Sequence, residues 1–164
     1  MLSNLSAFKV TLLNFILMLT WHIVTLIICR CLKTSYFNPE KYLYKQKKWE
    51  KNGKFYVKIL KIKKWKDHLP QFVSKKGFSK RTLLGQSERH NEYINRFIIE
   101  TCRAEWNHIV CCCYFTVSFF INSFLYGLIF SLVPVICNLP YVAIQRYNRI
   151  RLQKSKKYQC TTCT

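Results

Sequence analysis

The stretch Ile109–Ile144, IVCCCYFTVSFFINSFLYGLIFSLVPVICNLPYVAI, contains 36 residues and no charged side chain. As one continuous helix it would measure about 54 Å, well beyond the roughly 30 Å of a bilayer's hydrocarbon core. The length therefore predicts a helical hairpin of two membrane spans, with Asn122–Ser123 or Gly127 at its tip. A single span with a re-entrant or interfacial remainder is the alternative.

A second apolar stretch, Val10–Cys29, lies near the start of the chain and carries His22 as its only ionisable group. Its twenty residues are long enough to cross a bilayer. A secretory signal would fit the preceding Lys9, but no small-residue cleavage site follows the apolar run. We therefore predict an uncleaved N-terminal transmembrane helix.

Basic residues are concentrated on both sides of the long apolar stretch. Residues 30–108 hold 20 Lys and Arg against 7 Asp and Glu, and residues 145–164 hold 6 basic residues and no acid. Basic loops stay on the cytoplasmic side of a membrane. The charge distribution therefore predicts a cytoplasmic central region and tail, an N-terminus outside, and three spans, with fewer spans as the alternative.

These patterns predict a mainly α fold in a small integral membrane protein with four consecutive regions. The regions are an N-terminal transmembrane anchor or signal-like segment (1–32), a basic cytoplasmic region (33–96), a membrane-associated catalytic region with one or two spans (97–152), and a basic tail (153–164).

Within the basic region the local patterns are mixed. Phe37–Glu50 fits an interfacial helix, and Lys51–Lys66 fits either a strand or a basic helix after an Asn-Gly turn. Asp67–Gln71 reads as a proline-containing loop, and Val73–Ser87 as irregular, before a helical pattern resumes at Glu88.

The basic region also limits the choice of partner. Its lysines and aromatic residues, such as Trp49 and Trp65, could bind nucleic acid through phosphates and stacked bases. An anionic lipid surface attracts the same side chains, by about 1 kcal/mol per basic residue near the membrane. Because apolar spans flank this region, we expect a lipid partner and no nucleic acid.

Nine cysteines do not form a recognisable metal-binding pattern. Seven lie in or beside apolar segments, where a thiol behaves as a small apolar residue. Cys160 and Cys163 form a lone CxxC pair, and a structural zinc site needs four ligands. We expect reduced, structural thiols and no metal, with metal binding or lipidation of some thiols as the alternatives.

The helical segment before the hairpin concentrates polar groups. At 100° per residue, Glu100, Arg103 and Asn107 share one helix face, and Glu105 and His108 lie three residues apart on the adjoining strip. Ionisable groups are costly beside a membrane-length apolar run, so they indicate a functional site. A hairpin would bring the polar cluster QRYNRIRL, which follows it, to the same membrane rim, around one shallow pocket.

Such a pocket suits transfer of a group between an amphiphilic donor and an amphiphilic acceptor. A neutral His108 oriented by Glu105 could take the proton from an attacking hydroxyl, a contribution of about 10²–10⁴-fold. Arg103, Arg146 and Arg149 could hold an anionic head group or stabilise negative charge on a carbonyl oxygen. The alternative is that the acidic residues only form helix-stabilising pairs with the arginine and the histidine.

Common catalytic signatures such as HxxxxD, GxSxG and HExxH are absent. Four other segments stand out: Glu50–Phe55 (EKNGKF), Ile62–Pro70 (IKKWKDHLP), Phe97–His108 (FIIETCRAEWNH) and Asn138–Leu152 (NLPYVAIQRYNRIRL). In order and spacing they resemble the glycosyl-4,4'-diaponeurosporenoate acyltransferase family of staphyloxanthin-type carotenoid biosynthesis. The GFSK stretch at 77–80 also looks like the family, whereas Ile150 stands where the family commonly has proline after QRYNR.

The resemblance implies a membrane acyltransferase that esterifies the sugar of a glycosylated carotenoid with a fatty acyl group. It implies an acyl thioester or another activated acyl donor as co-substrate, with no bound cofactor. It also implies a bacterial cell-membrane location, with lipid, the glycosylated carotenoid and other pathway enzymes as partners. The alternative function is a non-catalytic basic membrane protein that binds anionic lipid or scaffolds a lipid or pigment biosynthetic complex.

The resemblance further implies the site residues. The catalytic candidates are His108, Glu105 and Glu100. The substrate-binding candidates are Arg103, Asn107, Trp65, Lys66, Asp67, Gln145, Arg146, Tyr147, Asn148 and Arg149.

Overall fold

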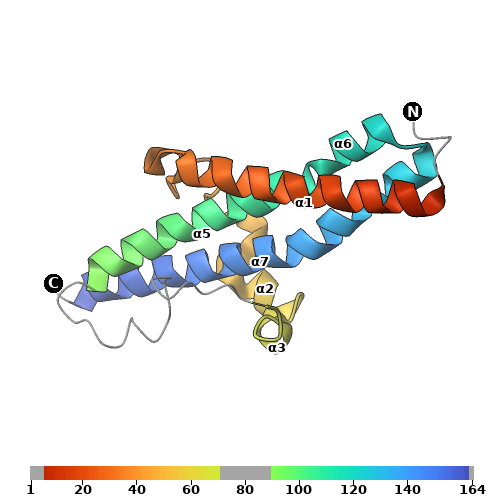
Figure 1. Cartoon of the computed structure of the whole chain (residues 1–164). Coiled ribbons are helices and arrows are strands. Elements are labelled where there is room, and N and C mark those ends of the chain that lie inside the picture. Colours follow the sequence, from red (N-terminus) through yellow and green to blue (C-terminus); the bar gives the residue numbers. More distant parts are fainter. Residues whose placement is uncertain (1–5, 71–89, 163–164) are drawn as a thin grey trace. The chain divides into compact units, whose positions relative to one another are not determined.

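A computed structural model describes residues 6–70 and 90–162, with side chains over 6–70 and 91–156. Within these residues the chain is helical and contains no strand, which confirms the mainly α prediction (Figure 1). The elements are α1 (Ala7–Cys31), η1 (Thr34–Phe37), η2 (Lys48–Gly53), α2 (Lys54–Lys58), α3 (Ile62–Trp65), α5 (His90–Cys112), α6 (Tyr114–Ile121) and α7 (Phe124–Thr162).

Two helices in the described residues are long and apolar enough to cross a membrane. They are α1, over Ala7–Cys31, and the Phe124–Lys156 part of α7. The eight residues of α6 would extend only about 12 Å, too short to cross a bilayer alone. The prediction of membrane-length helices toward both ends of the chain is confirmed. The first leg of the predicted hairpin falls on the end of α5 and on α6, and three spans stay a prediction.

The chain divides into two compact units, each built from discontinuous segments. Unit 1 consists of Met1–Lys33 and Ala104–Val142, and unit 2 consists of Thr34–Arg103 and Ala143–Thr164. Helices α5 and α7 each contribute one part to each unit. Residues 97–152, which the sequence predicts to form one membrane-associated region, are therefore divided between the two units.

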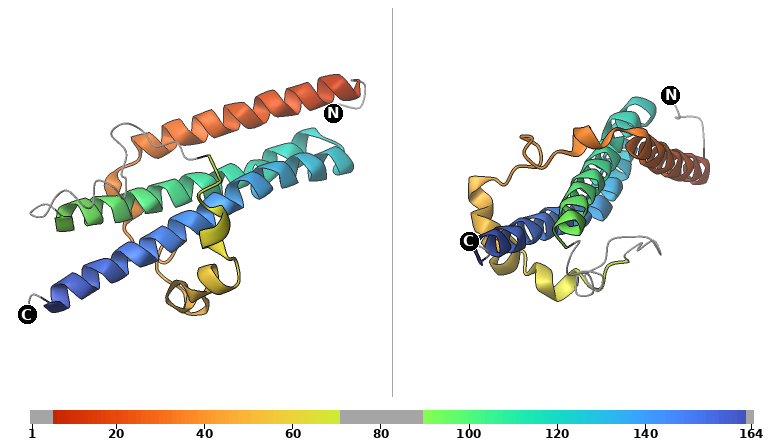
Figure 2. Two further views of the ribbon diagram at one scale, coloured as in Figure 1. Left: turned by 90° about the horizontal axis from the view of Figure 1, so that it is seen from below. Right: turned by 90° about the vertical axis from the view of Figure 1, so that its left-hand side faces the viewer.

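In unit 1 the chain turns back between α6 and α7. The break lies at Asn122–Ser123, one of the two predicted tips, whereas Gly127 lies inside α7. The Ser118 hydroxyl donates a hydrogen bond to the Gly127 carbonyl oxygen, 3.1 Å away, and joins the two helices beyond the turn. The sequence order α6, turn, α7 can be followed by colour in Figure 2.

Helix α1 runs antiparallel to the α5–α6 segment. Near its start, Asn14 and Asn122 exchange two amide hydrogen bonds of 2.8 and 2.7 Å. Further along, the Trp21 indole donates to the Val110 carbonyl oxygen at 3.1 Å. As residue numbers rise along α1, the partner numbers fall, which fixes the antiparallel direction.

Helix α1 runs parallel to the first part of α7. Asn14 of α1 contacts Asn122, which lies just before the start of α7. Further along both helices, His22 of α1 contacts Asn138 of α7 at 3.2 Å. Residue numbers rise together along both helices. Unit 1 is thus a bundle in which α1 and α7 point the same way and α5–α6 points back.

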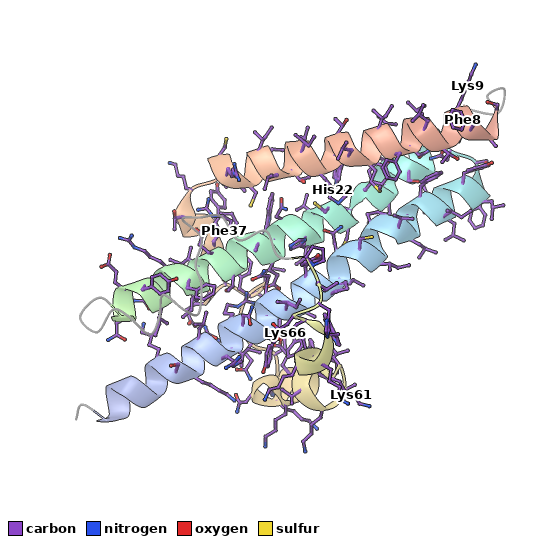
Figure 3. All side chains as sticks on the ribbon, turned by 60° about the horizontal axis from the view of Figure 1, so that its bottom comes forward. Phe8, Lys9, His22, Phe37, Lys61 and Lys66 are labelled. Carbon is purple, nitrogen blue, oxygen red and sulfur yellow. The ribbon has the colours of Figure 1, made fainter. Side chains whose placement is uncertain are left out.

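Unit 1 buries many polar side chains, and its surface is largely apolar. The buried polar side chains are Asn14, Thr25, Glu105, Ser118, Ser131 and Asn138, beside buried apolar residues such as Tyr114 and Phe130. Large apolar side chains such as Phe8, Phe15 and Leu19 are more than half exposed. Figure 3 shows side chains all along α1, with Phe8 near its start. This distribution is the reverse of that in a water-soluble bundle.

Unit 2 has an apolar interior. Its main cluster consists of Tyr56, Ile62, Ile144, Tyr147 and Ile150, and a second cluster of Ile94, Ile98 and Leu152. Lysines of α2, α3 and the segments beside them are mostly exposed. The sequence segments FIIETCR and RYNRIRL meet here, because Ile98 and Leu152 pack together.

Two local predictions for unit 2 were wrong or only partly right. The interfacial helix over Phe37–Glu50 does not form, because the Asn38 side chain accepts a hydrogen bond from the Glu40 amide at 2.9 Å, a turn that competes with helix. For Lys51–Lys66 the strand alternative is wrong, and short helices form instead.

The Asn-Gly turn signal in that segment is confirmed by backbone angles. Lys51, Asn52 and Gly53 have φ of 44°, 56° and 83°, the left-handed conformation that glycine and asparagine tolerate best. The predicted loop at Asp67 is also present up to Pro70. Gln71, the irregular segment at 73–87 and the GFSK stretch lie outside the described residues.

Candidate active site

A chain of hydrogen bonds links three helices inside unit 1. The Asn138 amide of α7 contacts His108 Nδ1 of α5 through Oδ1 at 2.9 Å and His22 Nε2 of α1 through Nδ2 at 3.2 Å. His22 Nδ1 lies 2.8 Å from the Met18 carbonyl oxygen, one turn earlier in α1. Figure 3 marks His22 on α1.

The His108 ring is fixed on a second side by an aromatic residue. Tyr141, three residues after Asn138, stacks on it with ring centroids 4.9 Å apart and planes 12° from parallel. Asn138 therefore holds His108 Nδ1, and the orientation of His108 by Glu105 stays a prediction. Glu105 itself is fully buried in unit 1, one turn before His108.

A buried ion pair dominates the polar chemistry of unit 2. Glu50 is 0% exposed, and its carboxylate accepts hydrogen bonds from Arg146 Nε at 3.0 Å, the Tyr56 hydroxyl at 2.5 Å and the Lys47 amide at 2.5 Å. Arg146 also donates to the Leu43 carbonyl oxygen at 3.1 Å. Arg146 therefore joins α7 to residues 43–50, and its predicted contact with substrate stays a prediction.

These contacts change the pKa of Glu50 and the pKa of Tyr56. Burial alone would raise the pKa of Glu50, but the hydrogen bonds from Arg146, Tyr56 and Lys47 outweigh it, so the pKa falls below its ordinary value. Burial and the bond to the carboxylate raise the pKa of Tyr56 well above that of a free phenol. Glu50 is therefore ionised and Tyr56 neutral at physiological pH.

Three of the four family-like segments meet around Gly53 and α7. A Cβ added to Gly53 would lie 3.5 Å from Ile150 Cγ2 and 3.9 Å from Tyr147 Cδ2. Trp65 packs against the same apolar cluster and donates its indole N–H to the Leu60 carbonyl oxygen at 2.8 Å. Ile150, which replaces the family's proline, is thus a packed core residue.

The remaining arginines of the motifs lie on aromatic rings. The Arg103 guanidinium lies 4.9 Å from the Phe37 ring centroid and pairs with Glu100 at 3.5 Å. The Arg149 guanidinium lies 5.6 Å from the Tyr44 ring centroid, and the residue is 2% exposed. Cation–π contacts of this kind hold both guanidinium groups against residues 34–44.

The other predicted substrate-binding residues differ in exposure. Lys66 is largely buried, with its ammonium 2.7 Å from a carboxylate oxygen of the mostly exposed Asp67. Tyr147 is buried in the core of unit 2, and Gln145 and Asn148 are half-buried. Asn107 is half-buried in unit 1, and its Oδ1 has no hydrogen-bond partner among the described residues.

Sequence reasoning did not select His22, Asn138 or Glu50 as site residues. A signal existed for His22, since an ionisable residue within a membrane-length helix is functional by default. Asn138 is an uncharged residue in an apolar run, and Glu50 is one of 7 acidic residues in a basic chain. Neither pattern identifies a partner far away in the sequence.

The chain thus presents a histidine held by polar helix contacts and a motif-rich unit built around a buried ion pair. It belongs to a family of acyltransferases: the family described as glycosyl-4,4'-diaponeurosporenoate acyltransferase matches residues 39–157. The family resemblance seen in the sequence is confirmed, and the chain is accordingly an enzyme of the acyltransferase class.

Curated relatives carry the same name. The chain is 31% identical over 156 residues to the glycosyl-4,4'-diaponeurosporenoate acyltransferase of Staphylococcus haemolyticus strain JCSC1435, covering 91% of this chain and 88% of the relative. It is 31% identical over 120 residues to that of Staphylococcus aureus strain N315, covering 72% and 70% of the two chains. No solved structure shows significant similarity to this chain.

Proposed function

We propose that this enzyme transfers a fatty acyl group to a sugar hydroxyl of glycosyl-4,4'-diaponeurosporenoate, a glycosylated carotenoid, or of a similar glycolipid. The family membership carries this proposal. The acyl donor is an acyl thioester or another activated acyl compound, which acts as co-substrate. Both substrates are amphiphilic, as suits a protein whose helices have membrane length.

In the proposed reaction His108 acts as general base. Its Nε2 takes the proton of the sugar hydroxyl, while the hydroxyl oxygen forms a bond to the acyl carbonyl carbon. Collapse of the tetrahedral intermediate breaks the bond to the donor's leaving group, which departs with its electron pair and receives the proton. Glu105, one helical turn away, is proposed to act electrostatically on the histidine. Glu100 is proposed as a further catalytic residue of the same motif.

The substrate contacts are proposed for the arginines and polar residues of the motifs. Among them, Arg103, Gln145 and Asn148 keep part of their surface exposed and so remain accessible to a ligand. Arg103 can stabilise negative charge on a carboxylate or on the developing oxyanion. The half-buried Arg146 and the buried Arg149 then support these residues from within unit 2.

We also propose three membrane spans, with the central region and the tail in the cytoplasm of a bacterial cell. Helices α1 and α7 run parallel in unit 1, by the contacts of Asn14 and His22. If both cross the bilayer in the same direction, the chain must return between them. The end of α5 with α6 is antiparallel to α1 and supplies this return. The polar interior and apolar surface of unit 1 fit lipid surroundings.

This placement puts the histidine site within the inner leaflet. His22 stands nine residues before the end of α1 at Cys31. At 1.5 Å per residue this corresponds to a depth of roughly 13 Å. The proposed acceptor therefore has to reach the base from the lipid phase, as a carotenoid with a long apolar chain can.

A second proposal is that unit 2 binds anionic lipid through the segment between α2 and α3. Ile59 is 67% exposed and Leu60 38% exposed, and Lys58 and Lys61 are exposed on either side of them. Apolar side chains among lysines can insert shallowly while the charges contact lipid head groups. This binding fits the non-catalytic alternative equally well, so it does not decide between the two.

The deciding experiment measures acyl transfer directly. Membranes containing the protein are incubated with glycosylated carotenoid and acyl-CoA, and the ester is detected by mass spectrometry. We expect ester with the wild type. With His108→Gln we expect the rate of ester formation to be about 10²–10⁴-fold lower. No ester with the wild type under any donor, together with an unchanged phenotype for Arg103→Lys and His108→Gln in cells, would favour the non-catalytic function.

A further inference from the structure

The hydrogen-bond chain His22–Asn138–His108 has only one consistent arrangement of protons. Asn138 Nδ2 lies 2.8 Å from the Pro134 carbonyl oxygen. A carbonyl oxygen only accepts, so this atom must be the amide nitrogen, and the orientation of the Asn138 side chain is fixed. The amide oxygen Oδ1 then faces His108, and the second N–H of Nδ2 faces His22.

The fixed amide determines the protonation of each imidazole. Because Asn138 Oδ1 only accepts, His108 Nδ1 must carry a proton and donate it across the 2.9 Å contact. Because Nδ2 donates, His22 Nε2 must be unprotonated, and His22 Nδ1 carries the proton that it donates to the Met18 carbonyl oxygen at 2.8 Å. Four independent contacts therefore agree on one tautomer for each histidine.

This arrangement leaves His108 Nε2 with a lone pair. A proton accepted there converts His108 to imidazolium while the Nδ1–H bond to Asn138 stays intact. A protonated His22, in contrast, would direct an N–H at the Nδ2–H of Asn138, so this contact disfavours the protonated ring. The stack on Tyr141, at 4.9 Å between ring centroids, limits rotation of the His108 ring.

We propose that Asn138 and His22 are positioning residues that hold His108 in the Nδ1-protonated tautomer and thereby make Nε2 the basic atom of the site. The inference rests on the proposed role of His108 as general base and adds two residues to it. One of them comes from α1, which lies outside the residues 39–157 matched by the family. Helix α1 is then part of the catalytic unit and cannot be removed as a signal would be.

The tautomer can be measured without any turnover. Nitrogen chemical shifts of ¹⁵N-labelled histidine in lipid nanodiscs distinguish Nδ1–H from Nε2–H and both from imidazolium. Wild-type protein should show both His22 and His108 as Nδ1–H, assigned through His22→Gln and His108→Gln. In Asn138→Leu the His108 signal should shift toward the Nε2–H tautomer, which predominates in free imidazole side chains.

Kinetics of the same variants test the consequence. Asn138→Leu should lower kcat with little change in KM, by up to about 10⁴-fold, the cost of a wrong tautomer in a serine-protease triad. His22→Leu should lower kcat about 10-fold, as expected for one lost buried hydrogen bond. His22→Gln should recover part of that loss, since the glutamine carbonyl can accept from Asn138. Thr20→Ala, an exposed change on the same helix, should leave kcat unaltered.

The outcomes separate this inference from the proposed function. An Nε2–H signal for His108 in the wild type overturns the inference, whether or not the protein transfers acyl groups. So does a kcat that is unchanged in both Asn138→Leu and His22→Leu while ester is formed. Nδ1–H signals in a protein that forms no ester would instead remove the acyltransferase mechanism and leave the hydrogen-bond chain in place.

Discussion

In unit 1 the buried positions include Asn14, Thr25 and Asn138, while Phe15 and Leu19 are exposed. In unit 2 the relation is reversed, with Ile62 and Ile150 buried and the surrounding lysines exposed. The same chain thus follows two opposite rules for which side chains it buries. Apolar exteriors are stable in lipid and apolar interiors in water, so this difference supports the proposed placement of unit 1 in a membrane.

The comparison also separates two ways of using polar groups. In unit 1 neutral amides, hydroxyls and imidazoles satisfy one another between helices, as Asn14 and Asn122 do. In unit 2 a charged pair, Glu50 and Arg146, is buried beneath a solvated basic surface. Glu105 is the acidic residue that unit 1 buries, and an ionisable group beside a membrane-length bundle is costly, so it marks a candidate functional position there.

The largest expected effect comes from breaking the ion pair of unit 2. Glu50→Ala removes the acceptor of the Arg146 guanidinium and of the Tyr56 hydroxyl, and should lower the free energy of unfolding by about 3–5 kcal/mol. Denaturant unfolding of the detergent-solubilised protein measures it. The control is Glu92→Ala, which breaks the exposed 2.6 Å pair with Arg96 and should cost only about 0.3–0.5 kcal/mol. Equal costs for the two variants would contradict the burial argument.

A charge placed on each surface tests the proposed placement of unit 1 in a membrane directly. Leu19 in the middle of α1 and Ile59 in unit 2 are 57% and 67% exposed. Leu19→Lys should cost about 2.5–3.5 kcal/mol of membrane integration, whereas Ile59→Lys should cost almost nothing. A membrane-integration assay with a topology reporter compares them. If Leu19→Lys integrates as well as Ile59→Lys, the apolar surface of unit 1 does not face lipid.

Replacing one glycine in each unit should change the stability by smaller amounts and in a definite order. Gly53→Ala in unit 2 forces a side chain into a φ of +83° and should destabilise the protein by about 1–2 kcal/mol. Gly127→Ala in unit 1 has helical backbone, and its Cβ meets the Phe119 ring at 3.0 Å. Because Phe119 is partly exposed and can move, and alanine favours helix, the net change there should be smaller. Thermal unfolding of both variants in one detergent tests the order, which a larger loss at Gly127 would refute.

The smallest expected effect near neutral pH is the pH dependence of the stability of unit 2. The pKa of Glu50 is lower in the folded protein than in the unfolded chain, so its contribution is present above the unfolded pKa, about 4.3, and is lost as the pH falls through the folded pKa. The pKa of Tyr56 is raised, so its contribution is present below about pH 10 and is lost as the pH rises further.

Two variants test these limits. Glu50→Gln should flatten the acid limb of a stability–pH profile, and Tyr56→Phe should flatten the alkaline limb. Asn14→Leu changes an uncharged pair in unit 1 and should alter neither slope. An acid limb that keeps its full steepness in Glu50→Gln would assign acid sensitivity to other carboxylates.

The sequence alone determined the helical class, the membrane-length helices toward both ends of the chain and the family, and it limited the turn to Asn122–Ser123 or Gly127. These features depend on composition, hydrophobic length and local turn residues, which act over short distances along the chain. The family motifs could be recognised for the same reason, because each is a run of consecutive residues. Local patterning failed at Phe37–Glu50, where one asparagine turn outweighed an apparently helical composition.

Only the tertiary structure decided which polar groups meet. His22 and Asn138 are separated by 116 residues, and Glu50 and Arg146 by 96, so no local rule pairs them. A buried donor or acceptor has to find its partner wherever packing places one, and that choice depends on how the helices run against each other. The direction of α1 along α7, and with it the orientation of His108, follows from those long-range contacts.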